Sequence, residues 1–189
     1  PGDRLGPQHK AIPASAWGLT IEEFLASEPR LAALETPVLT LDQSRMDHNL
    51  AAMARWVAER GMLLAPHGKT TMAPQLWNRQ LDAGSWAITL ATPWQVQLAR
   101  KFGVNRILLA NPIIGPGYLR WLTGELRAHP EFDFYSWADS VDTVEQMNAH
   151  LDDPSAPPIN VLVELGAPAG RTGARSVEEA VRVAEAVRA

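Results

Sequence analysis

The sequence predicts an α/β fold in which parallel strands are joined by crossover helices. The first observation is the order of the elements: from residue 36 onward, six short apolar runs alternate with helical patterns, with turn residues between them. The second is that polar side chains follow these runs, where the carboxyl ends of the strands would lie. An open doubly wound sheet and a (β/α)8 barrel both place their chemistry at that edge. The pattern therefore predicts the fold class and leaves the two architectures open.

The six apolar runs are the predicted strands, and a helix follows each of them. The strands are expected at 36–42, 62–69, 86–92, 106–111, 132–139 and 159–166. Ser44 is the expected cap of the first helix, which ends at Gly61. The apolar residues of this helix recur at spacings that place them on one face, and they are Met46, Leu50, Met53 and Val57.

Start signals mark the later helices. These helices are expected at 72–84, at 94–102, at 117–129, after Ser140 and after Ser176. Thr92 followed by Pro93 is typical of a cap and a first-turn proline. Ser176 and Glu179 have the spacing of a capping box. Residues 1–35 stand apart as a polar, Pro-rich lead and one helix at 20–34.

Composition excludes several classes of function. The chain has 189 residues, of which 46% are hydrophobic and 20% charged, so it can bury a core. A net charge of −4 gives no reason to expect nucleic acid or a membrane as partner. The chain has no cysteine, no long apolar run and no signal-peptide core, so we expect a cytoplasmic protein. The five histidines lack metal-ligand spacing, and we predict no metal site in this chain.

Lys69 lies in the stretch LLAPHGKTTMAP, whose GKTT resembles the end of a phosphate-binding loop. The resemblance fails because Leu63 stands where the first glycine belongs and because Pro66 removes a backbone donor. Lys69 and His67 are two residues apart on a predicted strand and should face the same side. A lysine that loses solvation there can act as a nucleophile or form a Schiff base. The alternative is a surface lysine just beyond the strand.

Four other residues are candidates for the same site. His67 is either a hydrogen-bonded core histidine or an acid or base. Glu164 lies among apolar residues and is interpreted as a supporting, paired carboxylate rather than a catalytic one. Three glycines bracket Arg171, which fits equally an arginine directed at an anionic oxygen and an ordinary strand-to-helix loop with an exposed arginine. Asn111 is a candidate because it directly follows a strand.

Three segments, APHGKTTMAPQLWNRQLDAGSWAITLAT, LLANPI and VELGAPAGRTG, carry a family resemblance. Together they resemble the fold-type III enzymes that use pyridoxal 5′-phosphate (PLP), whose N-terminal domain is like that of alanine racemase. The most similar branch contains the D-serine dehydratase-like amino acid deaminases and the D-threonine aldolases. In that branch a P-H-x-K-T segment carries the Schiff-base lysine. The resemblance covers about residues 36–175, and the motifs occur in the family's order.

The resemblance implies an incomplete (β/α)8 barrel of the alanine racemase type. Residues 1–42 would be an N-terminal segment whose strand joins a β-rich second domain, and 43–189 would be the first part of the barrel. The strand with the lysine would then be the first of five barrel strands. The remaining strands, the loops for the cofactor phosphate, a C-terminal β domain and its possible divalent metal would lie outside this sequence. Relatives are commonly homodimers.

The resemblance also implies roles for the candidate residues. Lys69 would form the Schiff base with PLP and act as the catalytic residue. Arg171 would hydrogen-bond the phenolic oxygen of the cofactor, and His67 would lie under or beside its ring. Asn111 would line the pocket, and Glu164 would belong to the cofactor-binding set. The implied function is that of a PLP-dependent lyase that converts D-serine-like 3-hydroxy amino acids to keto acid and ammonia. A D-threonine aldolase, an amino acid racemase and a non-catalytic PLP-binding protein are the alternatives.

Overall fold

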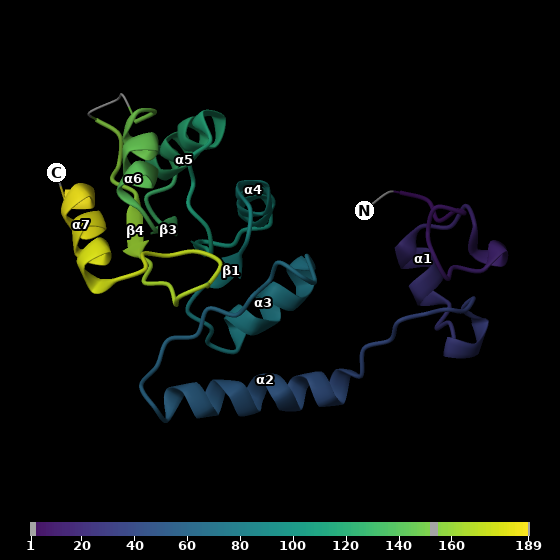
Figure 1. Ribbon diagram of the computed structural model, residues 1–189. Coiled ribbons are helices and arrows are strands. Elements are labelled where there is room, and N and C mark those ends of the chain that lie inside the picture. Colours follow the sequence, from purple (N-terminus) through teal and green to yellow (C-terminus); the bar gives the residue numbers. More distant parts are fainter. Residues whose placement is uncertain (1–2, 152–154, 189) are drawn as a thin grey trace. The chain divides into compact units, whose positions relative to one another are not determined.

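The chain divides into two units in the computed structural model, which describes residues 3–151 and 155–188. Pro1–Asp47 forms one unit and His48–Ala189 the other, so that the division falls within helix α2 (Gln43–Ala58). The helices and strands that follow α2 along the chain all belong to the second unit (Figure 1). The assignment of residues 1–42 to a β-rich domain stays a prediction.

The N-terminal unit is built from short helical pieces. They are η1 (Ala14–Ala16), α1 (Ile21–Ala26) and η2 (Leu31–Ala33). Thr20 and Glu23 form a capping box at the start of α1. The single helix predicted at 20–34 is wrong, because α1 ends before Pro29. A proline cannot donate the hydrogen bond that would continue the helix, and it disfavours helical backbone at the residue before it.

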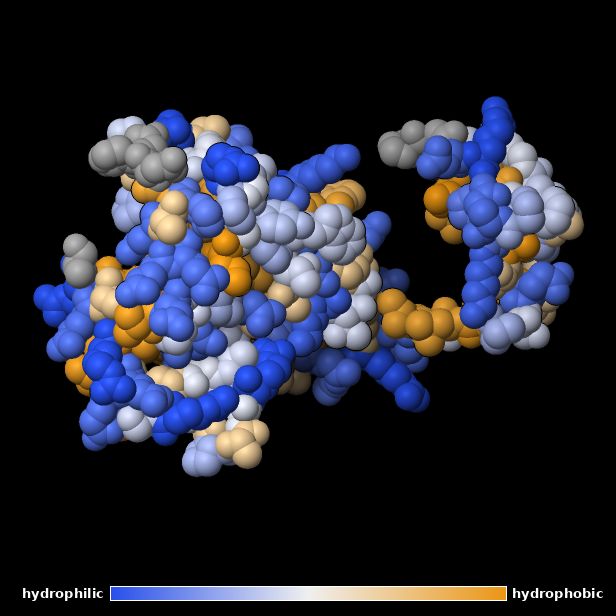
Figure 2. Space-filling view, turned by 45° about the horizontal axis from the view of Figure 1, so that its top comes forward, coloured by the Kyte–Doolittle hydropathy of each residue, from blue (hydrophilic) through white to orange (hydrophobic). Residues whose placement is uncertain are grey.

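The strand predicted at 36–42 is also wrong. This segment has no regular secondary structure, and no ladder joins it to any strand among the residues that the structure describes. Leu39 and Leu41 are 90% and 63% exposed, and hydrophobic surface is visible on the space-filling view (Figure 2). A strand needs a neighbour to complete its backbone hydrogen bonds. The family resemblance had placed that neighbour in the β-rich domain.

Helix α2 begins one residue before the predicted cap. Asp42, not Ser44, caps it, since the Asp42 carboxylate accepts a 3.0 Å hydrogen bond from the Arg45 backbone N–H. This bond and one from the Ser44 hydroxyl lower the pKa of Asp42. The predicted apolar face is covered only in part: Val57 is buried, whereas Met53 is 49% exposed.

The second unit contains a parallel four-stranded sheet, as the sequence predicted. The strands are β1 (Ile88–Leu90), β2 (Arg106–Leu109), β3 (Asp133–Ala138) and β4 (Asn160–Val163). The helices around them are α3 (Pro74–Asp82), α4 (Pro93–Lys101), α5 (Pro116–Ala128), α6 (Val141–Asn148) and α7 (Val177–Arg188). The strand order is β1-β2-β3-β4, so α4, α5 and α6 each connect neighbouring parallel strands. This is the crossover arrangement of an α/β fold.

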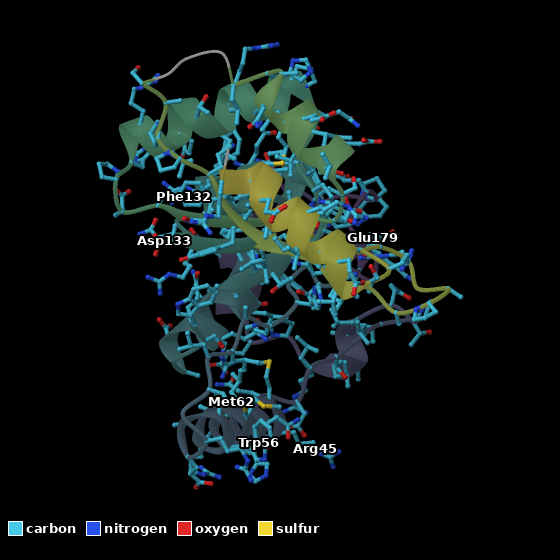
Figure 3. All side chains as sticks on the ribbon, turned by 60° about the vertical axis from the view of Figure 1, so that its left-hand side comes forward. Arg45, Trp56, Met62, Phe132, Asp133 and Glu179 are labelled. Atoms are coloured by element: carbon cyan, nitrogen blue, oxygen red, sulfur yellow. The ribbon has the colours of Figure 1, made fainter. Side chains whose placement is uncertain are left out.

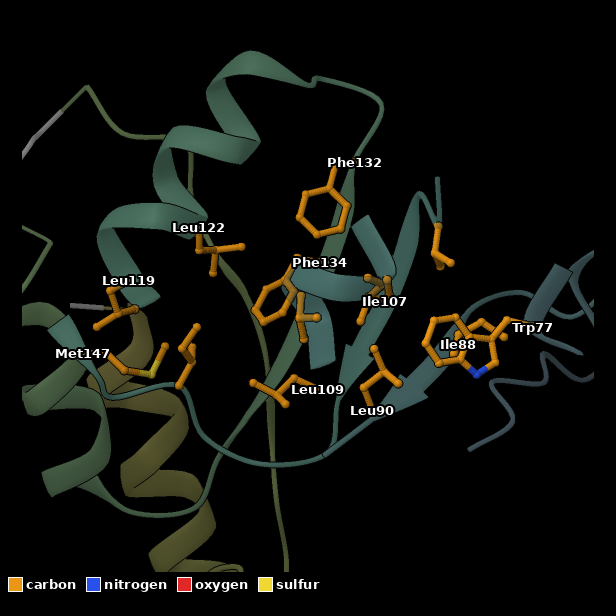
Figure 4. Packing of buried hydrophobic residues seen from close by; sticks show 14 residues of the cluster. Trp77, Ile88, Leu90, Ile107, Leu109, Leu119, Leu122, Phe132, Phe134 and Met147 are labelled. Carbon is orange, nitrogen blue, oxygen red and sulfur yellow. The ribbon is translucent and has the colours of Figure 1, made fainter. Parts of the chain in front are cut away.

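The core lies between one face of the sheet and its helices. Ile107 and Leu109 on β2 and Phe134 on β3 are fully buried, and Leu119 and Leu122 of α5 pack against them (Figure 4). Along β3 buried and half-buried side chains alternate, so the second face of the sheet is less covered. No helix in the described parts of the chain is long and apolar enough to cross a membrane.

The strand predicted at 62–69 survives only as a single bridge, between His67 and Thr89 of β1. The backbone N–H of Trp86 and of Thr89 still donate to the carbonyls of Leu64 and Pro66, at 2.7 and 2.8 Å. A longer ladder would need a donor at residue 66, and proline has none. Four ladder strands and this bridged segment together account for the five barrel strands that the resemblance implied.

Candidate functional site

Gly68 separates the two most reactive candidates, His67 and Lys69. Gly68 is buried while both neighbours are exposed, in keeping with the predicted alternation along an extended segment. The Gly68 carbonyl accepts a 3.1 Å hydrogen bond from the indole Nε1 of Trp77, which is fully buried on α3. A Cβ at Gly68 would overlap this indole and come within 2.8 Å of Ile88 Cγ2. Only glycine lets the backbone beside Lys69 pack so closely against α3 and β1.

Thr89 fixes the same segment from β1. Its backbone carbonyl accepts a 2.8 Å hydrogen bond from the Gly68 N–H, and its Oγ1 donates to the Ala65 carbonyl at 2.7 Å. The structure shows a buried threonine whose hydroxyl is used to hold the segment that leads to Lys69.

Asn111 and Lys69 meet at one hydrogen-bonded corner around Ala91. The Asn111 side-chain amide donates to the Ala91 carbonyl at 2.6 Å. Gln95, in the first turn of α4, accepts from the Ala91 N–H at 2.9 Å and donates to the Lys69 carbonyl at 3.4 Å. The corner therefore ties together the ends of three successive strand segments. Sequence reasoning predicted Asn111 and missed Gln95, whose position three residues after Thr92 was the available signal.

Glu164 follows β4, and only one of its carboxylate oxygens has a partner. Oε1 accepts a 2.8 Å hydrogen bond from the Thr172 hydroxyl, whereas Oε2 is buried and has no partner among the described residues. An unpaired buried oxygen is uncommon in native proteins and is expected where a further group binds. The predicted supporting role fits the Thr172 contact, since that contact joins β4 to the loop that carries Arg171.

Arg171 lies exposed in the loop between β4 and α7. The loop returns on itself, because Leu165 and Ala174 form a parallel bridge and the Gly166 N–H donates to the Ala174 carbonyl at 2.8 Å. Gly173 has a φ of +92°, in the left-handed region that favours glycine. The predicted glycine-rich loop is confirmed as a folded turn, with Arg171 at its outer part.

The electrostatics of His67 link these two regions. Burial lowers the pKa of His67, and the positive charges of Lys69 and Arg171 lower it further. Both cations are therefore close enough to act on the imidazole, which keeps it neutral near pH 7. The bridged segment and the β4 loop thus contribute an amine, an imidazole and a guanidinium to one positively charged region. Such a region attracts an anionic ligand.

Two polar residues at strand ends do not join this region. Ser136 is fully buried on the face of β3 that carries Phe134 and Ala138, which is the face packed against helices. Asp139 accepts a 2.7 Å hydrogen bond from the Thr143 hydroxyl and so supports the start of α6. Residues 3–151 and 155–188 contain no group of three or more His, Asp or Glu side chains that could hold a metal ion.

Comparison with known sequences identifies two relatives. A D-threonine aldolase from Arthrobacter sp is 29% identical over 143 residues, which are 76% of this chain and 37% of the relative. A D-threo-3-hydroxyaspartate dehydratase from Delftia sp. (strain HT23) is 32% identical over 80 residues, or 42% of this chain and 21% of the relative. No family model matches the chain.

Solved structures show the same fold. D-threonine aldolase from Filomicrobium marinum superposes with a TM-score of 0.74 at 25% identity, over 84% of this chain and 42% of that protein. Alanine racemase from E. faecalis gives a TM-score of 0.60 at 17% identity, over 72% of this chain and 37% of that protein. The likeness to alanine racemase, at this identity, concerns the fold alone.

The predicted resemblance to fold-type III enzymes is therefore confirmed, together with the incomplete alanine racemase-type barrel. The chain spans well under half of the length of the relatives it matches: 37% of the aldolase and 21% of the dehydratase.

Proposed function

We propose that this chain is the PLP-binding part of a lyase that acts on D-amino acids with a hydroxyl group on the β-carbon. The observation that carries the proposal is the arrangement around Lys69. The lysine lies in the P-H-x-K-T segment, is exposed, and shares a positively charged region with His67 and Arg171. The relatives named as an aldolase and a dehydratase of D-amino acids support the same class.

The residues present fit PLP. A primary amine is needed to bind the cofactor aldehyde covalently, and Lys69 supplies one. The cofactor carries anionic oxygens, and Arg171 presents a guanidinium with no hydrogen-bond partner among the described residues. The buried, unpartnered Oε2 of Glu164 is a further polar atom at this edge that a bound group could satisfy.

When bound, PLP acts as an electron sink for a bond broken at the substrate Cα. The protein residues then have to move protons. The Lys69 amine is the proposed base that takes the Cα proton. His67, whose pKa is lowered, is neutral near pH 7 and available to accept a proton. Asn111 and Gln95 hold the backbone at this corner, so that the main chain of Lys69 is fixed beside β1.

Dehydration is the leading reaction, and aldol cleavage is the second candidate. In dehydration the Cα proton and the β-hydroxyl leave as water, and hydrolysis of the resulting enamine by a second water gives a keto acid and ammonia. In aldol cleavage the β-hydroxyl loses its proton and the Cα–Cβ bond breaks, which gives glycine and an aldehyde. The D-threonine aldolase matches more of this chain than the dehydratase does, 76% against 42%, and this observation keeps the aldolase reaction in view.

Product analysis with the full-length protein tests the proposal. The protein, loaded with PLP, is incubated separately with D-serine, D-threonine and D-threo-3-hydroxyaspartate, and Lys69→Ala serves as the matched control. Ammonia and keto acid would support dehydration, and glycine with aldehyde would support aldol cleavage. Inversion at Cα alone would favour a racemase. Cofactor bound at Lys69 without turnover of any substrate would favour a non-catalytic PLP-binding protein and contradict the proposal.

The remaining expectations belong to the same proposal. We propose a homodimer in the cytoplasm, with amino acids as its ligands and with neither nucleic acid nor a membrane as partner. The net charge of −4 supports the expectation of neither nucleic acid nor membrane as partner, and the absence of cysteine supports the cytoplasm. A divalent metal, where one is used, would be held outside the residues described here.

A further inference from the structure

Arg175, two residues before α7, binds the backbone of the loop that carries Arg171. Its guanidinium donates three hydrogen bonds to backbone carbonyls of that loop. Nη1 donates to Ala167 at 2.9 Å and to Thr172 at 3.1 Å, and Nη2 donates to Gly170 at 2.9 Å. The carbonyls of Gly170 and Thr172 flank Arg171 on both sides. One side chain therefore fixes the backbone immediately before and after the proposed anion-binding arginine.

Close backbone packing makes this loop dependent on glycine. A Cβ at Gly166 would overlap the Thr172 carbonyl oxygen, and a Cβ at Gly173 would overlap the backbone of Gly166. The two sides of the loop are thus in direct backbone contact. Three carbonyls of this loop accept hydrogen bonds from the single Arg175 guanidinium, and one of them, that of Ala167, also accepts from the Gly170 N–H.

Arg175 is itself anchored to helix α7. Its backbone N–H donates a 2.5 Å hydrogen bond to the Glu179 carboxylate in the first turn of α7. Ser176 accepts a 3.1 Å hydrogen bond from the Glu179 N–H. Figure 3 shows Glu179 at the N-terminal end of α7, next to this loop. The loop is therefore supported from two sides, by β4 through the contact between Glu164 and Thr172 and by α7 through Arg175.

The guanidinium of Arg171 is left free by this arrangement. Among residues 3–151 and 155–188 it makes no hydrogen bond or ion pair, although it is close enough to His67 to lower the pKa of that imidazole. The backbone that carries this cation is fixed by the hydrogen bonds of Arg175, so binding of an anionic oxygen orders the Arg171 side chain without having to order the loop as well.

We propose that Arg175 is a positioning residue that holds the Arg171 loop in the shape that binds PLP. This inference rests on the proposed function, because it takes PLP as the ligand of Arg171. Arginine suits the position because its planar fork can donate to several carbonyls at fixed angles, which a lysine ammonium on a flexible stem does less well. Arg175 acts through Arg171 and has no contact with the ligand in this proposal.

The test compares Arg175→Gln with Arg182→Gln in the full-length protein. Arg182 is an exposed residue of α7, so both variants lose one arginine and one trypsin site near the same helix. The first readout, taken without cofactor, is the rate of tryptic cleavage after Arg171, followed by mass spectrometry. The second readout is the dissociation constant for PLP, followed by absorbance. Arg175→Lys keeps the charge and shows whether the fork geometry matters.

We expect Arg175→Gln to be cleaved after Arg171 about tenfold faster, and to bind PLP about tenfold more weakly, than the wild type. Arg182→Gln should match the wild type in both readouts, and Arg175→Lys should fall between. An unchanged rate of cleavage in Arg175→Gln would show that Arg175 does not hold the Arg171 loop. Faster cleavage with an unchanged dissociation constant for PLP would show that the shape of the loop does not matter for PLP binding. Failure of the wild type to bind PLP would instead contradict the proposed function, and the cleavage rates would still decide whether Arg175 holds the loop.

Discussion

The indole Nε1 of Trp77 donates a hydrogen bond to the carbonyl oxygen of Gly68 at 3.1 Å, in a buried contact directly beside Lys69. Trp77 on α3 can make this contact only because the residue on the bridged segment is glycine, since a Cβ at Gly68 would overlap the indole. The backbone is held from below by the indole, so the two neighbouring side chains, His67 and Lys69, are left on the exposed side. The position of the proposed catalytic amine therefore depends on packing.

Gly68→Ala should destabilise the protein and displace Lys69. The added Cβ would overlap the Trp77 indole and crowd Ile88, and such overpacking costs about 1–3 kcal/mol in free energy of unfolding. The measurement is urea unfolding, together with the yield of the PLP adduct on Lys69. Gly124→Ala is the matched control. Gly124 lies within α5 with open space around a Cβ, so that change should stabilise by about 0.5–1 kcal/mol.

Trp77→Phe should lower the free energy of unfolding by about 0.5–1.5 kcal/mol, the net value of one hydrogen bond, because the buried Gly68 carbonyl loses its indole donor but keeps the Met72 N–H, and most of the packing remains. Trp94→Phe serves as the control, since Trp94 is 56% exposed, and it should have little effect. Equal stability of the two variants in urea would contradict the importance of the hydrogen bond.

Gln95→Met should weaken PLP binding more than it changes the fold. The variant keeps the length of the side chain but removes its hydrogen bonds to the Ala91 N–H and the Lys69 carbonyl. We expect a loss of about 0.5–1.5 kcal/mol of stability for a partly exposed hydrogen bond, and a larger dissociation constant for PLP. Gln97→Met, two residues further along α4, is the control and should bind PLP as the wild type does.

His67 should make the protein less stable as the pH falls. Its pKa lies below the ordinary value of 6.5 because burial and the charges of Lys69 and Arg171 disfavour the imidazolium. The unfolded chain therefore takes up a proton before the folded protein does. The stability linked to this group is fully present above about pH 6.5 and is lost as the pH falls toward the folded-state pKa.

The measurement for His67 is urea unfolding at pH 8 and at pH 5.5. The free energy of unfolding of the wild type should decrease more between these values than that of His67→Gln. His48→Gln, a change at an exposed residue of α2, should behave as the wild type does. An identical decrease in all three proteins would show that the histidine does not experience the two cations.

The sequence was sufficient for the parallel sheet because its signals are local. Caps such as Thr92 and Ser140 accept hydrogen bonds at the predicted helix starts, and the apolar runs became β1 to β4. The sequence was insufficient where the structure depends on whether a strand finds a neighbouring strand to pair with. The run at 36–42 has strand composition but no partner strand among the described residues, and the run at 62–69 carries Pro66, which cannot donate to a ladder.

Of the candidate site, only the residues whose side chains can take part directly in chemistry or ligand binding could be predicted from the sequence. Lys69, His67 and Arg171 were predicted from their motif and from the strand ends, and the positive charges of Lys69 and Arg171 both lower the pKa of His67. Gln95 and Arg175 were missed because they bind backbone carbonyls that are set by the three-dimensional fold. A side chain that binds a carbonyl several residues away leaves no periodic pattern in the sequence.

The most direct test of the account is borohydride reduction of the full-length protein after incubation with PLP, followed by peptide mapping. The proposal predicts a pyridoxyl group on Lys69, and it predicts that Lys69→Arg abolishes this label while nearby Lys101→Arg, an exposed residue of α4, leaves it intact. A wild-type protein that carries no pyridoxyl group on Lys69 would contradict the central claim that this lysine binds the cofactor covalently.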